Sequence, residues 1–125
     1  MQNLILVMIG GGLGAGARHL VNVFVPRIVG TAFPWQTVTV NIVGSFLMGL
    51  LIGWLARKGG EGTGTQLLLA TGVLGGFTTF SAFSLDFALL WERGEAATAF
   101  VYAGISVIGA LTAIFAGLWL VRTLG

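Results

Sequence analysis

Residues 72–84 read Gly72-Val73-Leu74-Gly75-Gly76-Phe77-Thr78-Thr79-Phe80-Ser81-Ala82-Phe83-Ser84. They lie inside an apolar segment that runs from about residue 67 to residue 91. Paired glycines followed by paired threonines are poor helix formers, so the pattern predicts a local distortion of any helix formed here. Two alternatives remain open for this stretch: a kinked helix packed in a core, or unwound backbone that faces an ion.

The composition of the chain is that of a membrane protein. Only 8% of the 125 residues are charged and 56% are hydrophobic, with a mean hydropathy of +0.98. A soluble domain carries about a quarter charged residues, so this chain cannot cover a water-facing surface. The net charge of +2 comes from isolated positions, which excludes a nucleic-acid partner, and the absence of cysteine excludes disulfides and thiolate metal sites. The partner that this composition requires is the lipid bilayer.

Polar turns divide the chain into four apolar segments, at about residues 4–25, 38–56, 67–91 and 96–121. A helix needs roughly 20 residues to cross a hydrocarbon core of about 30 Å, and all four segments approach or exceed that length. Pro26 and Pro34 are expected to bracket the first loop. We therefore expect an all-α membrane protein, with residues 1–125 forming a single four-helix transmembrane domain.

Positive charges are distributed almost evenly between the two expected sides of the membrane. One side gathers three, Arg57, Lys58 and Arg122; the other gathers Arg27 and Arg93, with Arg18 as a third if it reaches that interface. Because Lys/Arg asymmetry sets orientation, so small a bias is typical of a chain that inserts both ways and pairs antiparallel with itself. A weak bias also arises by chance in short proteins, and the charge count leaves both explanations open.

Glycine is abundant, at 21 of 125 residues, and recurs at four-residue spacing. Such pairs allow helix backbones to approach closely in lipid, so most of these glycines are expected to be packing residues. The pairs are Gly10 and Gly14, Gly12 and Gly16, Gly49 and Gly53, and Gly72 and Gly76.

A few polar and aromatic side chains fall at membrane depth. They are Asn41 and Ser45 in the second segment, Phe80 and Phe83 in the third, and Tyr102 and Ser106 in the fourth. One interpretation is that the polar groups are hydrogen-bond contacts between helices. The other follows from their chemistry: amide N–H groups, hydroxyls and ring edges are neutral donors, which suit a small anion better than a cation.

Three motifs resemble the Fluc family of fluoride channels, and the resemblance covers essentially the whole chain. They are Gly11-Gly12-x-Gly14-Ala15-x-x-Arg18, Thr37-x-x-Val40-Asn41-x-x-Gly44-Ser45 and the run from Gly75 to Ser84. The resemblance implies an antiparallel dual-topology homodimer in the bacterial inner membrane, with the third helix broken near its middle. It also implies passive export of toxic fluoride through two pores per dimer, and a central structural sodium ion (Na+).

The resemblance also assigns roles by position. In the fluoride pore it places the amide of Asn41, the rings of Phe80 and Phe83, the hydroxyls of Thr79 and Ser81, and Tyr102. Arg18 is assigned to the vestibule, and the backbone carbonyls of Gly75 and Thr78 to the sodium ion.

The chain departs from the family pattern at three positions. His19 stands where an aromatic residue is common, Ala110 where relatives often have a serine, and Asp86 where a glutamate is usual. With Ala110 in place, Ser106 is the nearest substitute for the missing pore hydroxyl. The sequence assigns no role to Asp86.

Two alternative functions remain. A small antiparallel multidrug or cation transporter needs an intramembrane carboxylate, normally in the first segment, and here only Asp86 lies within a segment. A non-transporting membrane assembly subunit would need only the packing glycines. An enzyme is not expected, because nothing in the sequence pairs a nucleophile with a base.

Overall fold

The computed structural model describes residues 1–60 and 62–124, and all regular structure within them is helical. The first, second and fourth spans are α1 (Gln2–Val29), α2 (Trp35–Lys58) and α6 (Ala96–Leu124). The third span is divided into α3 (Gly64–Gln66), the π-helix η1 (Leu67–Leu74), α4 (Gly75–Phe77) and α5 (Ser81–Glu92). Four helical stretches are long and apolar enough to cross a membrane, which confirms the predicted number of spans.

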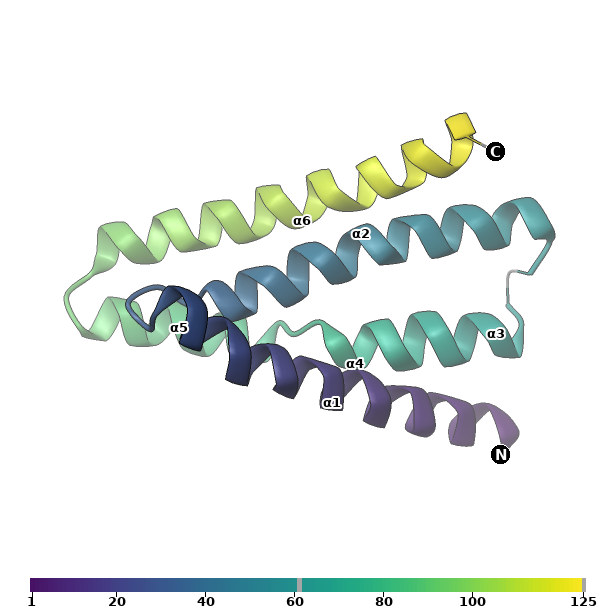
Figure 1. The fold of residues 1–125 in the computed structure, drawn as a ribbon, viewed down its shortest axis with the longest axis horizontal. Coiled ribbons are helices and arrows are strands. Elements are labelled where there is room, and N and C mark those ends of the chain that lie inside the picture. Colours follow the sequence, from purple (N-terminus) through teal and green to yellow (C-terminus); the bar gives the residue numbers. More distant parts are fainter. Residues whose placement is uncertain (61, 125) are drawn as a thin grey trace.

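The helices lie roughly side by side, with α2 between α6 and the third span and with α1 crossing obliquely (Figure 1). The start of α1 and the end of α6 lie at the same end of the bundle as the end of α2 and the start of α3 (Figure 1). The α1–α2 and α5–α6 connections lie at the opposite end. The most extensive packing is between α2 and α6, followed by that of α1 on η1 and α4.

The third span is interrupted where the paired threonines occur. Helix α4 ends at Phe77, and Thr78 is extended, with φ −85° and ψ 162°, before α5 begins at Ser81. The interruption is visible in Figure 1 as a short non-helical connection between α4 and α5. The predicted break is confirmed, and it leaves backbone groups at the middle of the span that need partners other than helical ones.

Glycines allow the close helix contacts, as expected for most of the pairs. A Cβ added at Gly49 would collide with the backbone oxygen of Ile114 in α6, and one at Gly14 would collide with that of Val73 in η1. The pair Gly12 and Gly16 differs, because a Cβ at either position would meet nothing within 4 Å. Within one protomer this pair therefore has no packing role.

The first connection begins later than predicted. Pro26 and Arg27 do not lie in the loop, because α1 continues through both of them to Val29. Pro26 is in the last turn of α1. Because proline has no backbone N–H, the helix loses one hydrogen bond there, only a few residues before it ends. Gly30 ends the helix with φ +86°, a left-handed conformation that favours glycine.

The outer surface is apolar and the protomer core is small. Large side chains such as Met8, Phe115 and Trp119 are more than half exposed, whereas the compact core cluster consists of Val38, Leu90, Ala99 and Tyr102. Surfaces of this kind need lipid or a partner chain to cover them.

Candidate functional site

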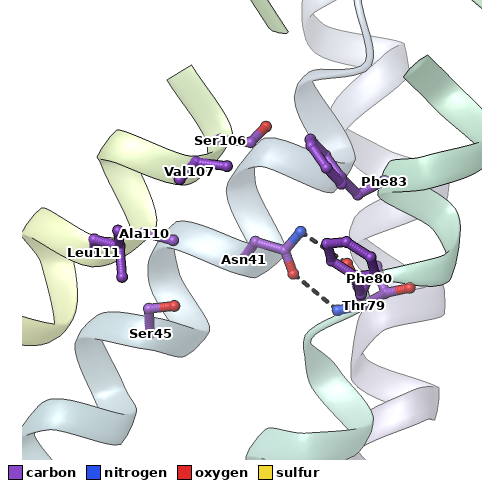
Figure 2. A pocket seen from close by; sticks show the side chains of 9 residues that line it. All are labelled: Asn41, Ser45, Thr79, Phe80, Phe83, Ser106, Val107, Ala110 and Leu111. Atoms are coloured by element: carbon purple, nitrogen blue, oxygen red, sulfur yellow. Dashed lines mark hydrogen bonds between the residues drawn. The ribbon is translucent and has the colours of Figure 1, made fainter. Parts of the chain in front are cut away.

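The side chain of Asn41 connects α2 to the break in the third span. Its Nδ2 donates to the Thr79 carbonyl oxygen at 2.9 Å, and its Oδ1 accepts from the Thr79 backbone N–H at 2.8 Å (Figure 2). The amide thus satisfies the backbone N–H and the carbonyl of Thr79, which have no helical partners. Each group would cost about 1–3 kcal/mol if it were left unpaired. Because an amide has two N–H groups, one remains to donate elsewhere.

Asn41 also lines a cavity of about 240 Å³, which we call the amide groove. Side chains from α2, the break, α5 and α6 surround it (Figure 2). Among the described residues that line it, none is charged. They are Asn41, Ser45, Thr79, Phe80, Phe83, Ser106, Val107, Ala110 and Leu111.

Two kinds of neutral donor accompany the amide. The rings of Phe80 and Phe83 both line the groove, with centroids 5.5 Å apart and planes tilted by 41°, and the edges of aromatic rings are electropositive. Within the described chain, the Ser106 hydroxyl oxygen is fully buried near the Tyr102 hydroxyl and makes no hydrogen bond of acceptable geometry. Ser106 and Ala110 both line the α6 wall of the groove, but the Ser106 oxygen itself is shielded from it.

The structure brings five of the seven predicted pore residues to the amide groove: Asn41, Thr79, Phe80, Phe83 and Ser106. Ser81 and Tyr102 do not line it. Ser81 is exposed, with its Oγ 3.4 Å from the Thr79 Oγ1. Tyr102 is fully buried, and its ring lies 5.3 Å from that of Phe83. The sequence had not placed Val107 and Leu111 at the groove.

Asp86 acquires a defined role in the structure. Its Oδ2 accepts hydrogen bonds from the Tyr102 hydroxyl at 2.9 Å and from the Thr37 Oγ1 at 2.6 Å. Tyr102 and Thr37 are both buried, so the carboxylate satisfies two donors on α6 and α2 that are shielded from water. The Tyr102 hydroxyl is thereby directed to Asp86.

Arg18 also makes a hydrogen bond to the third span, close to its break. Its Nε donates to the Gly76 carbonyl oxygen at 3.0 Å, across the contact between α1 and α4. A guanidinium is favourable there, because the carbonyl groups at a helix C-terminus carry partial negative charge. Arg18 does not line the amide groove, and its neighbour His19 is exposed.

The carbonyls of Gly75 and Thr78 lose the donors that a continuous α-helix would provide. The Thr79 N–H, four residues after Gly75, donates to Asn41, and the Ala82 N–H, four residues after Thr78, donates to the Thr79 hydroxyl at 3.0 Å. Both carbonyl oxygens are therefore available to a hard cation, which prefers oxygen ligands. In the described part of the chain, no group of three His, Cys, Asp or Glu side chains offers an alternative metal site.

The chain matches known proteins over nearly its whole length. Residues 5–118 match the family described as CrcB-like protein, Camphor Resistance (CrcB). The chain is 61% identical to the fluoride-specific ion channel FluC of Mesorhizobium japonicum over 124 residues, covering 99% of each chain. It is 56% identical to that of Chelativorans sp., again covering 99% of each, and 55% identical to that of Sphingopyxis alaskensis, covering 99% of this chain and 98% of the relative. With its four spans and these matches, this multi-pass membrane protein belongs to the CrcB-like family.

Proposed function

We propose that this chain is a subunit of a fluoride-selective channel through which toxic fluoride leaves the cell passively across the inner membrane. The observation that carries the proposal is the amide groove, a cavity beside the broken span lined by neutral donors. Relatives that are more than half identical are named fluoride-specific ion channels. A channel family is non-enzymatic, in keeping with the absence of a catalytic pair in the sequence.

The donor set suits a small, strongly hydrated anion. Conduction requires that binding be favourable enough for entry and weak enough for exit, so several neutral donors serve better than one buried cation. The remaining N–H of Asn41 and the edges of Phe80 and Phe83 are donors of this kind, and Ser106 would join them only if its buried hydroxyl turned toward the groove. Chloride is larger than fluoride, and a narrow ring of donors excludes it by size.

The functional unit in this proposal is an antiparallel homodimer with two pores. Phe80 is 77% exposed in the protomer, so a ring assigned to the pore needs a second chain to cover it. The nearly even Lys/Arg counts favour both orientations in one membrane. Reporter fusions at the C-terminus should report both orientations, and a single orientation would exclude this assembly.

A sodium ion at the dimer centre completes the proposed assembly. The carbonyl oxygens of Gly75 and Thr78 supply two ligands per protomer, and two protomers supply four. When bound, the ion would neutralise the partial charges of carbonyls that lack helical donors. Removing sodium should weaken the dimer in size-exclusion chromatography, and a dimer insensitive to sodium would argue against a structural ion.

The decisive experiment is transport by the purified protein in liposomes. Vesicles loaded with potassium fluoride and treated with valinomycin should release fluoride, whereas vesicles loaded with potassium chloride should retain chloride. Uptake of a drug cation without fluoride release would instead identify the multidrug transporter. Neither activity, from protein with an intact dimer profile, would identify an assembly subunit.

A further inference from the structure

A second cavity lies at the end of the bundle that holds the chain termini, between the last turns of α2 and α6. Its volume is about 430 Å³, and it is lined by Trp54, Arg57, Lys58, Val121 and Leu124. It is remote from the amide groove, with which it shares no lining residue. Its lining combines two cations, an indole ring and two aliphatic side chains.

Arg57 links the two helices that form this cavity. Its Nη1 donates to the Val121 carbonyl oxygen at 2.8 Å, so the guanidinium connects the end of α2 to α6. Val121 lies within the last four residues of α6, whose carbonyls have no helical donor. The bond fixes the positive charge of Arg57 beside the aliphatic wall of the cavity.

The charges at the two ends of the bundle differ. Among the described residues, this end carries three cationic side chains and no acidic one, and Glu61 in the same connection lies outside them. The opposite end carries two cations and two acids, and one pair of these forms an ion pair, from Arg93 Nη2 to Glu95 Oε2 at 3.3 Å. The cavity therefore opens at the more positive end of the protein.

The order of the lining groups along α2 matches the order of groups in a lipid. Trp54 is 48% exposed, and indole rings favour the membrane interface. Lys58 lies one helical turn further out, about 6 Å at 1.5 Å per residue. Val121 lies beside Gly53, one residue before Trp54, so an acyl chain packed on Trp54 and Val121 would place its phosphate near Lys58 and Arg57.

We infer that this cavity binds the phosphodiester head group of an anionic phospholipid, with Lys58 and Arg57 as the cationic contacts. Basic cavities between membrane-spanning helices are suited to such head groups. In the proposed antiparallel dimer the two protomers place one such site in each leaflet. The bound lipid then covers the apolar ends of α2 and α6.

The test uses the purified full-length protein in detergent and native mass spectrometry. Phosphatidylglycerol and phosphatidylcholine with the same acyl chains are titrated separately. We expect tighter binding of phosphatidylglycerol, and Lys58→Gln should weaken it about fivefold, the effect of one cation near a lipid surface. Phosphatidylcholine binding should fall by less, because its choline cation offsets the charge of the same phosphodiester. Lys58 makes no hydrogen bond or ion pair among the described residues, so this variant keeps the contact between α2 and α6 intact.

Arg122→Gln is the matched control, because Arg122 lies at the same end but does not line the cavity. It should leave phosphatidylglycerol binding unchanged. An equal loss in Arg122→Gln and Lys58→Gln would show diffuse surface charge and overturn the inference, as would equal binding of the two lipids. Competition by inorganic phosphate at concentrations similar to those of the lipid would identify a soluble anion as the ligand, and would also overturn it.

Discussion

The substitution Asn41→Asp replaces the amide NH2 group with an oxygen. It tests two roles of the amide at once, one in the fold and one in the pore. The variant keeps an oxygen that can accept from the Thr79 N–H, whose nitrogen lies 2.8 Å from Oδ1 of Asn41. It replaces the Nδ2 that donates to the Thr79 carbonyl with a second oxygen. It also places a negative charge beside the amide groove.

The lost hydrogen bond and the added negative charge have effects of different size. In the variant, the ionised carboxylate leaves the Thr79 carbonyl without its donor, which costs about 1–3 kcal/mol of folding free energy. Fluoride in the groove would lie about 4 Å from the new charge, and two unit charges at that distance repel by about 4 kcal/mol at an effective dielectric constant of about 20. That repulsion corresponds to roughly a thousandfold lower occupancy. Conduction should therefore be almost abolished while much of the dimer survives.

Acidification should reverse both effects. A protonated carboxyl can donate to the Thr79 carbonyl and accept from the Thr79 N–H, so it restores both original hydrogen bonds without the charge. Fluoride efflux per folded dimer is measured at neutral and acidic pH, with protein-free vesicles correcting for leakage of hydrogen fluoride. Ser45→Ala is the control, because Ser45 lines the same groove and makes no hydrogen bond among the described residues.

Two results would refute this reasoning. Normal efflux from the variant at neutral pH would remove Asn41 from the anion path. An intact dimer that stays inactive on acidification would show that charge and hydrogen bonding do not explain the loss. A variant that fails to assemble at neutral pH but assembles on acidification would support the structural role alone.

Three further predictions address other parts of the structure. Phe80→Ile and Phe83→Ile should each reduce fluoride efflux by about two- to tenfold, the effect of losing a ring-edge contact, with an unchanged size-exclusion profile; normal efflux would indicate a packing role. Gly14→Ala should reduce the yield of folded protein because its Cβ would collide with a backbone carbonyl, whereas Gly12→Ala should be tolerated within the protomer. Asp86→Ala leaves two buried donors unpaired and should cost about 2–6 kcal/mol in thermal unfolding, whereas Asp86→Asn, which retains an acceptor, should cost less.

Features that depend on local composition were predictable from the sequence. The four spans follow from the length of each apolar segment. The paired glycines and threonines indicate a distortion near Thr78 but leave a kink and a break as alternatives, and the break itself was implied by the family resemblance. The packing of Gly10, Gly14 and Gly49 follows from their spacing. The exact end of α1 was missed, because a proline normally disfavours a helix at its position, whereas α1 continues through Pro26 to Val29.

Features that depend on distant partners were not predictable. The donors to Asp86 come from positions 49 and 16 residues away, and no spacing rule relates them. The same is true of Asn41 and Thr79, which are 38 residues apart. The π-helical form of η1 also has no signal in its leucine-rich sequence. In each case the three-dimensional packing selects the partner, and the residue type shows only that some partner is needed.

The break in the third span also separates two mechanical units. The half before it, η1 and α4, packs on α1 and α2, whereas the half after it, α5, packs on α6. A small sliding of these units past one another would be absorbed by residues 78–80, where the backbone has no helical stiffness. The two hydrogen bonds of Asn41 hold Thr79 between the two halves, so one side chain of α2 both lines the groove and fixes the junction of the half-helices.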